Sequence, residues 1–440
     1  MKEEEILANV SGRLGIKALN AMQRKMLANF DGGGDVVLLS PTGSGKTIAY
    51  LIPVLKGLRE PVGQVQAVVI APSRELVMQI GEIARQLATG HKVTCCYGGH
   101  NVADEKQSLS VVPSIIVSTP GRMLDHINRG HVDVSSVSML VLDEFDKSLE
   151  LGFQDEMKRV LGHMRNVSRR VLTSATMIDS FPDFLKLSRV RTFNFLDGNK
   201  QVSARIKVWK VISPERDKLA TVLALLGNLP NSRSIIFANY REAAERIYKY
   251  LSDSGVSAGL YHGGLDQQER EVALTLFENG THIVLVTTDL GSRGLDIAGV
   301  TAIVHYHLPV SQEAYIHRNG RTARVAAEGE VFVVLGPDEV VPEYMSFDGQ
   351  RSLEFDNRVD LSSGVASLYF QAGKKEKLSR GDIVGFIANN GGITAREIGQ
   401  ISLYDHYAIV AVPRSEVEAV LERISRLKIK NKRVRISIIG

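Results

Sequence analysis

The residues of this chain best suited to chemistry are Lys46 and Thr47, which end the stretch VVLLSPTGSGKT at residues 36–47. Residues 36–39 form an apolar run that predicts a buried parallel strand, and residues 48–55 predict the start of a helix. Gly43 and Gly45 lie between them and allow backbone N–H groups to turn inward, beside the partial positive charge of a helix N-terminus. The stretch predicts a phosphate-binding loop, with Lys46 on the terminal phosphates and Thr47 on Mg²⁺.

The loop departs from the strict pattern G-x-x-x-x-G-K-[ST], because Ser40 occupies the position of the first glycine. The alternative is an ordinary glycine-rich turn between a strand and a helix. The flanking strand and helix favour phosphate binding, so we expect the loop to contact nucleotide through Ser40, Pro41, Thr42, Gly43, Ser44, Gly45, Lys46 and Thr47.

A second chemical signal is the acid pair Asp143 and Glu144, which follows the apolar run at residues 138–142. An acid directly after a strand holds Mg²⁺ in nucleotide hydrolases. We expect Asp143 to bind the metal, through water, and Glu144 to polarise the attacking water. The alternative, that acids simply end strands and cap helices, is less favoured when a phosphate loop precedes them.

The elements that would position these residues alternate between strands and helices. Strands are expected at residues 36–39, 67–72, 114–120, 138–146 and 169–176, and again at 234–239, 282–289, 302–309 and 332–336. This alternation predicts an α/β fold with two tandem parallel sheets, whose ligands bind at the carboxyl ends of strands. Residues 195–214 are polar and irregular, which predicts a linker between the two sheets.

The second half of the chain carries a run with three arginines, Arg318, Arg321 and Arg324. Arg321 and Arg324 are three residues apart and would share one face of a helix. By itself the run favours a solvated helix face. If it faced a phosphate loop across a cleft, Arg321 and Arg324 would instead stabilise a transferring phosphate.

Composition narrows the class of protein. The 440 residues carry a net charge of +4, and residues 373–440 hold 13 Lys and Arg against 7 Asp and Glu, so the preceding residues carry −2. This basic segment favours a nucleic-acid partner over a merely solvated face. The two cysteines, Cys95 and Cys96, are adjacent and cannot build a disulfide framework, so a reducing, cytoplasmic location is expected. The sequence shows no signal peptide and no apolar run long enough for a membrane span.

Together these residues resemble the motifs of the DEAD-box RNA helicases, a family of superfamily 2 ATPases. The resemblance covers about residues 1–340 and rests, in chain order, on Gln23, SPTGSGKT (40–47), PSREL (72–76), YGG (97–99), TPGR (119–122), DEFD (143–146), SAT (174–176), SIIFAN (234–239), QQER (267–270), TTDLGSRGLDI (287–297) and HRNGRTAR (317–324). It implies two RecA-like domains that bind ATP and Mg²⁺.

The resemblance also implies roles for individual residues. Gln23 would read adenine, Asp296 would contact the ribose, and His317 would belong to the nucleotide site. Lys46, Asp143, Glu144, Arg321 and Arg324 would form the catalytic set. The RNA backbone would be faced by Arg74, Gly99, Thr119, Arg122, Thr287 and Thr288.

Four positions depart from the family pattern. Phe145 replaces a small alanine beside the acid pair, Ala323 replaces a glycine, and Ser73 replaces a threonine. Ile6 stands where relatives place an aromatic residue, so weaker adenine stacking and a less strict nucleotide preference are expected.

The C-terminal segment predicts a small α+β domain with strands at residues 367–373, 407–413 and 433–439 and helices near 382–388 and 416–424. It lacks the aromatic pattern with which a standard RRM sheet stacks bases. SRGDIVGFI, ITAREIGQI and KIKNKRVRI resemble the DbpA-type RNA-binding domain, which implies recognition of structured ribosomal RNA. The expected RNA-binding residues are Lys374, Lys375, Lys377, Lys428, Lys430, Lys432 and Arg433.

The sequence therefore predicts domains at residues 1–200, 205–340 and 366–440, with a linker at 341–365. The expected function is an RNA-stimulated ATPase that acts on single strands and short duplexes. By analogy its target is 23S ribosomal RNA in pre-ribosomal particles during assembly of the large subunit. Two alternatives stay open: a DNA-directed superfamily 2 ATPase, and a non-catalytic ATP-gated RNA clamp in which Phe145 disables the acid pair.

Overall fold

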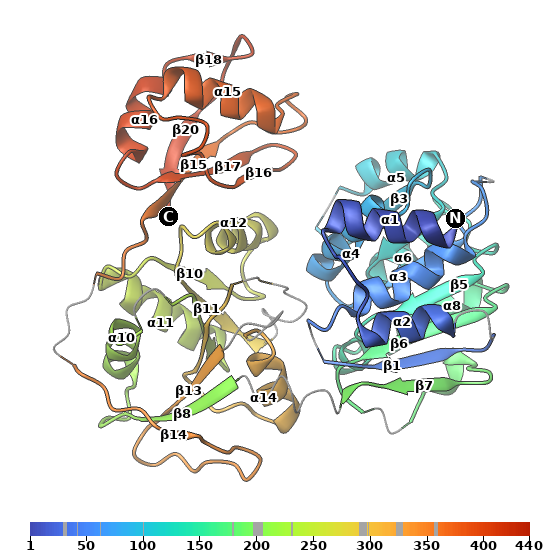
Figure 1. Cartoon of the computed structure of the whole chain (residues 1–440), viewed down its shortest axis with the longest axis horizontal. Coiled ribbons are helices and arrows are strands. Elements are labelled where there is room, and N and C mark those ends of the chain that lie inside the picture. The colour runs from blue at the N-terminus through green and yellow to red at the C-terminus, as the bar shows by residue number, and fades with distance from the viewer. Residues whose placement is uncertain are drawn as a thin grey trace. The chain divides into compact units, whose positions relative to one another are not determined.

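The structure is a computed structural model of the chain. It describes residues 1–29, 33–41, 43–61, 63–99, 101–177, 180–196, 206–229, 232–289, 297, 299–322, 329–355 and 360–440. The chain forms two compact units, which divide between residues 204 and 205. A first parallel-sheet domain makes up the first unit. The second unit contains a second parallel-sheet domain and the C-terminal domain (Figure 1).

The first domain is built on a seven-stranded sheet in the order β3-β4-β2-β5-β6-β1-β7, and every pairing is parallel. Its strands are β1 (Val36–Leu39), β2 (Ala67–Ile70), β3 (Val93–Cys96), β4 (Ile115–Ser118), β5 (Met139–Leu142), β6 (Arg169–Ser174) and β7 (Arg191–Asn194). Strands β1, β2, β4 and β5 are buried at every position, because helices cover both faces of the sheet.

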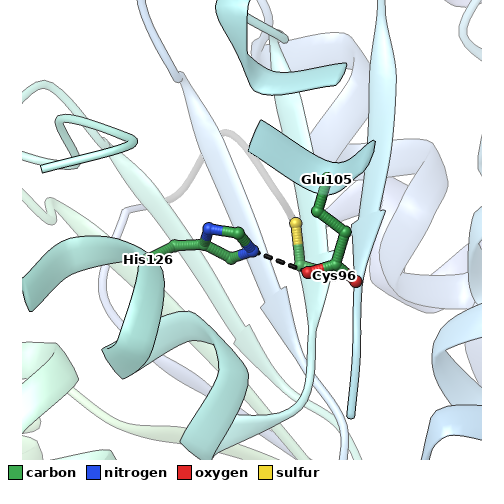
Figure 2. A group of neighbouring side chains, drawn as sticks. All are labelled: Cys96, Glu105 and His126. Atoms are coloured by element: carbon green, nitrogen blue, oxygen red, sulfur yellow. Dashed lines mark hydrogen bonds and ion pairs between the residues drawn. The ribbon is translucent and has the colours of Figure 1, made fainter. Parts of the chain in front are cut away.

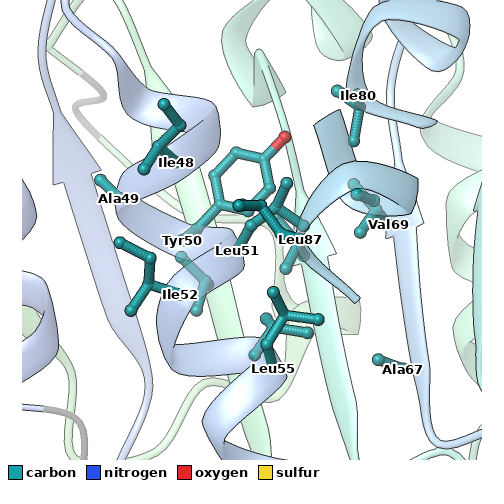
Figure 3. Close-up of a cluster of buried hydrophobic side chains, with 14 of the residues drawn as sticks. Ile48, Ala49, Tyr50, Leu51, Ile52, Leu55, Ala67, Val69, Ile80 and Leu87 are labelled. Atoms are coloured by element: carbon teal, nitrogen blue, oxygen red, sulfur yellow. The ribbon is translucent and has the colours of Figure 1, made fainter. Parts of the chain in front are cut away.

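Alternating strand residues feed two apolar clusters, one on each face of this sheet. On one face Val36, Leu38 and Val69 pack against α1 (Glu3–Leu14), α2 (Ala21–Ala28), α3 (Lys46–Gly57) and α4 (Arg74–Leu87) (Figure 3). On the other face the sheet meets α5 (Val102–Ser110), α6 (Pro120–Asn128), α7 (Phe145–Glu150), α8 (Gln154–His163) and the short helix η1 (Asp183–Leu185). The phosphate loop is thus fixed between a fully buried strand and a largely buried helix.

The second parallel-sheet domain also has seven parallel strands, in the order β10-β11-β9-β12-β13-β8-β14. They are β8 (Ile206–Ile212), β9 (Ser234–Ala238), β10 (Ala258–Tyr261), β11 (Val284–Thr288), β12 (Ala302–His305), β13 (Gly329–Leu335) and β14 (Gly349–Gln350). Its described helices are α10 (Leu219–Gly227), α11 (Arg241–Asp253), α12 (Gln267–Glu278) and α14 (Gln312–Asn319).

The C-terminal domain has a four-stranded antiparallel sheet in the order β16-β17-β15-β20 and a separate hairpin. The sheet strands are β15 (Val365–Phe370), β16 (Ile401–Leu403), β17 (Ala408–Pro413) and β20 (Ile436–Ile439). Helices α15 (Arg380–Asn390) and α16 (Val417–Ile424) cover one sheet face, and β18 (Lys428–Ile429) pairs with β19 (Lys432–Arg433). The predicted α+β class is confirmed.

Two expectations about linkers are wrong in part. Within residues 195–214, which were expected to be irregular, Ile206–Ile212 forms β8 and pairs with β13 and β14. Within the expected linker 341–365, Gly349–Gln350 forms β14 of the second sheet, and Leu353 and Leu361 pack on that domain's core. β14 is the edge strand of this sheet and is only two residues long, while β8 lies between β14 and β13, so pairing with neighbouring strands decides both structures.

Candidate nucleotide and RNA site

The predicted phosphate loop is built as the sequence indicates. Gly43 and Gly45 adopt positive φ angles of 73° and 86°, which a side chain rarely tolerates, and Lys46 begins α3 directly after them. Lys46 is buried, and its Nζ donates to the backbone oxygen of Ser40 at 2.8 Å. The ammonium therefore lies across its own loop, where a phosphate can replace the carbonyl oxygen as acceptor. Thr42 lies outside the described residues.

Gln23 is attached to this loop. Its side-chain oxygen accepts from the backbone N–H of Asn20 at 2.9 Å, while Nε2 donates to the Gly45 oxygen at 3.3 Å. A Cβ atom on Gly45 would come within 2.7 Å of that Nε2, so the glycine makes room for the amide. Gln23 thus connects the start of α2 to the phosphate loop. Adenine reading by Gln23 stays a prediction.

The acid pair lies at the end of β5, buried and hydrogen bonded. Asp143 accepts from the Thr173 hydroxyl at 2.5 Å through Oδ1 and from the Tyr50 hydroxyl at 3.1 Å through Oδ2. Glu144 adopts a left-handed conformation, with φ 46° and ψ 53°, and its backbone N–H donates to Thr173 Oγ1 at 3.1 Å. The structure thus holds two consecutive acids at the end of β5; their roles in metal binding and water activation stay predictions.

Tyr50 is a site residue that the sequence analysis missed. It is fully buried in α3, donates to Asp143 and accepts a hydrogen bond from Thr47. Burial, and then the nearby Asp143 carboxylate, raise the pKa of Tyr50 well above its usual value, so the hydroxyl keeps its proton. The residues predicted to hold Mg²⁺, Thr47 and Asp143, therefore meet around one neutral hydroxyl. Tyrosine in an apolar helix carries no sequence signal for this contact.

The departures from the family pattern near the nucleotide site are accommodated by packing. Phe145 is completely buried in the apolar cluster beneath α7, and Asp146 still accepts from the Thr176 hydroxyl at 2.9 Å. Ile6 is also completely buried, in the cluster formed by α1 and α3. Phe145 therefore fills the core without displacing the acids around it.

Residues predicted to face RNA gather at the carboxyl ends of the neighbouring strands β3, β4 and β2. Arg74 begins α4 after β2, and Gly99 follows β3 with φ 79°. A Cβ on Gly99 would come within 2.4 Å of the Arg74 guanidinium, so only glycine lets these two segments meet. Thr119 and Arg122 follow β4 at the start of α6. The structure brings four of the predicted RNA contacts to one edge of one sheet.

The buried carboxylate of Glu105 connects the segments that follow β3 and β4 at this edge. The sequence analysis did not select this residue. Glu105 accepts from the backbone N–H of Tyr97 at 3.0 Å, from Arg122 at 3.1 Å and from His126 Nε2 at 2.6 Å. Figure 2 shows the bond between His126 and Glu105, with Cys96 beside it. Glu105 thus holds both the GG segment and Arg122 of the TPGR segment.

Cys96, Glu105 and His126 place three possible metal-ligand atoms within 4.8 Å of one another. The charge of Glu105 is already balanced by Arg122, and burial raises the pKa of the Cys96 thiol, which disfavours the thiolate that a metal needs. These contacts favour a positioning role for the cluster over metal binding.

In the second parallel-sheet domain an ion pair joins the segment after β11 to helix α14. Thr287 and Thr288 end β11 and are buried, and Asp289 follows them. Arg318 donates to both carboxylate oxygens of Asp289 at 2.6 Å, and its guanidinium lies 5.2 Å from the centre of the Phe237 ring. Arg318 is therefore a structural arginine that joins the two motif segments.

His305 completes this network. Its Nε2 lies 2.8 Å from Asn319 Oδ1 and its Nδ1 lies 3.4 Å from Arg318 Nη1, so the neutral ring donates to one and accepts from the other. Burial, and then the Arg318 charge, lower the pKa of His305 to about 3.

One expectation about the arginine run is wrong. Helix α14 ends at Asn319, so Arg321 lies in the following turn and not on a helix face. Arg321 and the nucleotide-site residue His317 are both buried. Asp296 and Arg324 lie outside the described residues, so their predicted roles stay predictions.

In the C-terminal domain the predicted basic residues form one patch. Lys430 Nζ donates to the Lys377 backbone oxygen at 3.1 Å, and Lys432 Nζ donates to the Glu376 oxygen at 3.1 Å. These bonds attach the β18–β19 hairpin to the turn that carries Lys374 and Lys375. We call this surface the basic patch, defined by Lys374, Lys375, Lys377, Lys428, Lys430, Lys432 and Arg433.

Two RecA-like parallel sheets, the first with a phosphate loop and an acid pair, define a nucleotide-hydrolysing motor of the helicase class. Comparison with known families agrees. Residues 20–184 match the DEAD/DEAH box helicase family, 217–326 the helicase conserved C-terminal domain, and 367–438 the DbpA RNA binding domain.

Known proteins identify the family. The chain is 29% identical over 437 residues to ATP-dependent RNA helicase DbpA of Escherichia coli (strain K12), covering 97% of this chain and 95% of that one. It is 31% identical to DEAD-box ATP-dependent RNA helicase RhpA of Helicobacter pylori (strain B128), covering 77% of this chain and 69% of that one. The structure of S. cerevisiae Dbp5 bound to RNA and ADP BeF3 matches with TM-score 0.69 at 27% identity, over 76% of this chain and 88% of that one.

The chain belongs to the DEAD-box ATP-dependent RNA helicases. Within that family it is of the DbpA type, with the RNA-binding domain behind the helicase core. Among the described residues, none of the helices has the length and apolar character needed to cross a membrane.

Proposed function

We propose that the protein is an ATP- and Mg²⁺-dependent helicase that opens short RNA duplexes locally and acts on 23S ribosomal RNA during assembly of the large ribosomal subunit. The proposed helicase activity is best supported by the edge of the first sheet at which the nucleotide-site residues and the RNA-facing residues lie together. Its strands end in the phosphate loop, the acid pair and the RNA-facing residues Arg74, Gly99 and Arg122. One sheet therefore positions the residues for both ATP and RNA.

For hydrolysis, Lys46 binds the terminal phosphates and Glu144 accepts the proton of the attacking water. Thr47 and Asp143 fit Mg²⁺, since both offer oxygen ligands around the Tyr50 hydroxyl. When bound, the ion neutralises charge that develops on the phosphates. Arg321 and Arg324 stabilise the transferring phosphate, and binding of RNA favours the hydrolysing state.

The ribosomal target rests on analogy with the DbpA-type domain and on the basic patch. A basic surface binds the RNA backbone of a folded target without reading much sequence. The patch supports RNA binding, and the domain's family supports the ribosomal assignment.

The test is steady-state ATP hydrolysis by the full chain with matched RNA and DNA strands in excess. We expect RNA, and not DNA, to stimulate turnover. Equal stimulation by DNA would replace this proposal with the DNA-directed alternative. RNA binding without any turnover would favour the non-catalytic clamp.

A second experiment addresses the target. Crosslinking the protein in cells and sequencing the attached RNA is expected to recover 23S ribosomal RNA in excess of its share in matched uncrosslinked controls. Recovery of other RNA classes alone would contradict the ribosomal assignment while leaving the helicase activity in place.

A further inference from the structure

The face of the C-terminal sheet opposite α15 and α16 carries three stacked tyrosines. Strand residues alternate, so that Leu368 and Phe370 point into the helix-covered core while Tyr369 points to the other face. The rings of Tyr369 and Tyr407 lie 5.3 Å apart, and those of Tyr404 and Tyr407 lie 4.5 Å apart. The sequence predicts no base-stacking aromatics here, yet this is the kind of face on which RRM sheets stack bases.

This face is covered by α12 of the second parallel-sheet domain. The Tyr407 hydroxyl donates to Glu271 Oε2 at 2.8 Å, the Tyr369 hydroxyl accepts from Gln268 Nε2 at 2.9 Å, and the Tyr404 hydroxyl lies 2.5 Å from Thr275 Oγ1. All three tyrosine hydroxyls are therefore engaged by one helix.

Apolar and polar contacts extend the same surface. Leu276 of α12 packs with Tyr407 and Ile409, and these three side chains are buried. Ser367 of β15 is within hydrogen-bond distance of Asn279 Nδ2, at 2.9 Å, and of Thr281 Oγ1, at 2.8 Å. Satisfied hydrogen bonds around a dry apolar centre are the features of a stable interface.

We propose that the tyrosine face is a permanent dock for α12, which makes the C-terminal domain a rigid arm of the second parallel-sheet domain and leaves RNA to the basic patch. We call the surface formed by Tyr369, Tyr404 and Tyr407 the tyrosine dock. This proposal goes beyond helicase activity, because a domain that merely tethers RNA through a flexible linker would need no such surface.

Charge separates the two surfaces of the domain. Glu271 brings a carboxylate to the tyrosine dock, which opposes entry of a phosphate backbone. Lys428, Lys430, Lys432 and Arg433 of the basic patch lie on the β18–β19 hairpin, which contacts α15 on the sheet face opposite the tyrosines. The turn with Lys374 and Lys375 lies closer to the dock, because their backbone N–H groups donate to the backbone oxygens of Tyr404 and Asp405. RNA can therefore occupy the hairpin side of the patch without displacing α12 from the dock.

The dock also involves a helix that begins with a helicase motif. Residues 267–270 of α12 form the QQER segment, while Gln268, Glu271 and Thr275 contact the tyrosines. The orientation of the C-terminal domain is consequently fixed to the element that carries Gln267 and Arg270. An RNA held by the basic patch meets the second parallel-sheet domain at a defined angle and distance.

The test measures distances in the full chain by pulsed electron paramagnetic resonance. Spin-labelled non-canonical amino acids replace the exposed residues Lys249 and Glu418, so that both native cysteines are kept. We expect one narrow distance distribution. The double variant Tyr404→Ala/Tyr407→Ala should broaden it, whereas Leu427→Ala, at an exposed residue of the same domain, should not.

Because the double variant could disturb the C-terminal fold, Thr275→Arg breaks the same contact from α12 and leaves that domain's core intact. Broadening by both variants supports the dock, and an unchanged narrow distribution in Thr275→Arg overturns it. A broad distribution in the unmodified chain also overturns it. With saturating poly(U) RNA the narrow distribution should persist. Broadening would show that RNA bases take the tyrosine face, which refutes the assignment of RNA to the patch.

RNA affinity provides an independent readout at fixed salt concentration. Thr275→Arg should change the affinity for poly(U) by less than about threefold, whereas Lys430→Glu/Lys432→Glu should lower it by about tenfold or more, because phosphate contacts dominate binding. The opposite ranking would overturn the proposal.

Discussion

The two parallel sheets have the same strand number and direction but differ in what their carboxyl edges carry. The first edge presents a glycine loop, hydroxyls and an acid pair. At the corresponding edge of the second sheet, Arg318 and Asp289 form an ion pair in which Arg318 donates to both oxygens of Asp289. Their charges therefore neutralise each other. The first edge is built to bind a nucleotide, and the second is built as a stable platform for residues such as Arg321.

The comparison predicts a large loss of turnover from a change to the acid pair of the first edge. Glu144→Gln removes the proton acceptor but keeps the side chain's shape, and we expect RNA-stimulated turnover to fall by about 10³-fold. ATP affinity, measured by equilibrium titration, should change by less than about threefold. Glu156→Gln, at a partly exposed acid on α8, serves as the control. Substantial turnover in Glu144→Gln would remove its assigned role.

A change to the ion pair of the second edge should act on stability instead. Arg318→Ala leaves Asp289 without its bidentate partner, and the free energy of unfolding of this domain should fall by about 3–5 kcal/mol. The exposed pair of Arg216 and Asp338 provides a matched control, since Arg216→Ala should cost less than about 1 kcal/mol. Denaturant titration of both variants checks the difference, and equal losses would contradict the platform role.

The same platform should be sensitive to acid. Because the folded pKa of His305 is lowered to about 3, its contribution to stability is full above the unfolded pKa of about 6.5 and is lost as pH falls toward 3. Between pH 7 and pH 5 this group should reduce the free energy of unfolding by about 2 kcal/mol. Denaturant titrations at both pH values should show a smaller decrease for His305→Asn than for the unmodified chain. An unchanged pH dependence would contradict the assignment.

The smallest predicted effect concerns how the first edge holds RNA. Glu105→Gln keeps the shape of the acceptor but loses the charge that orients Arg122. The RNA concentration for half-maximal ATPase should rise by about five- to tenfold, equivalent to about 1–1.4 kcal/mol, with the maximal rate and the KM for ATP unchanged. Glu82→Gln, an exposed acid on α4, should change none of these quantities. A fall in maximal rate would indicate a structural role instead.

Much of the fold follows from the sequence because several strands, such as β1, β2 and β5, are continuous apolar runs. Strands β3 and β7 were not predicted, since VTCC and RTFN are short and partly polar, and β10, with the sequence AGLY, contains glycine. Pairing with neighbouring strands makes these segments strands, so their identity depends on tertiary context.

Motif residues were predictable as a group because parallel strands bring their carboxyl ends to one edge. Tyr50 and Glu105 were not, since each acts through a contact with a residue distant in the chain and lies on an ordinary helix. Tyr369, Tyr404 and Tyr407 were missed for the same reason: only the fold shows that α12 covers them.

The most direct test of the account is ATP turnover by Arg321→Ala with saturating RNA, measured beside ATP affinity. If the second domain supplies charge to the reaction, turnover should fall by about 10³-fold or more while ATP binding stays within about threefold of normal. Near-normal turnover would show that hydrolysis proceeds without this arginine and would contradict the central claim.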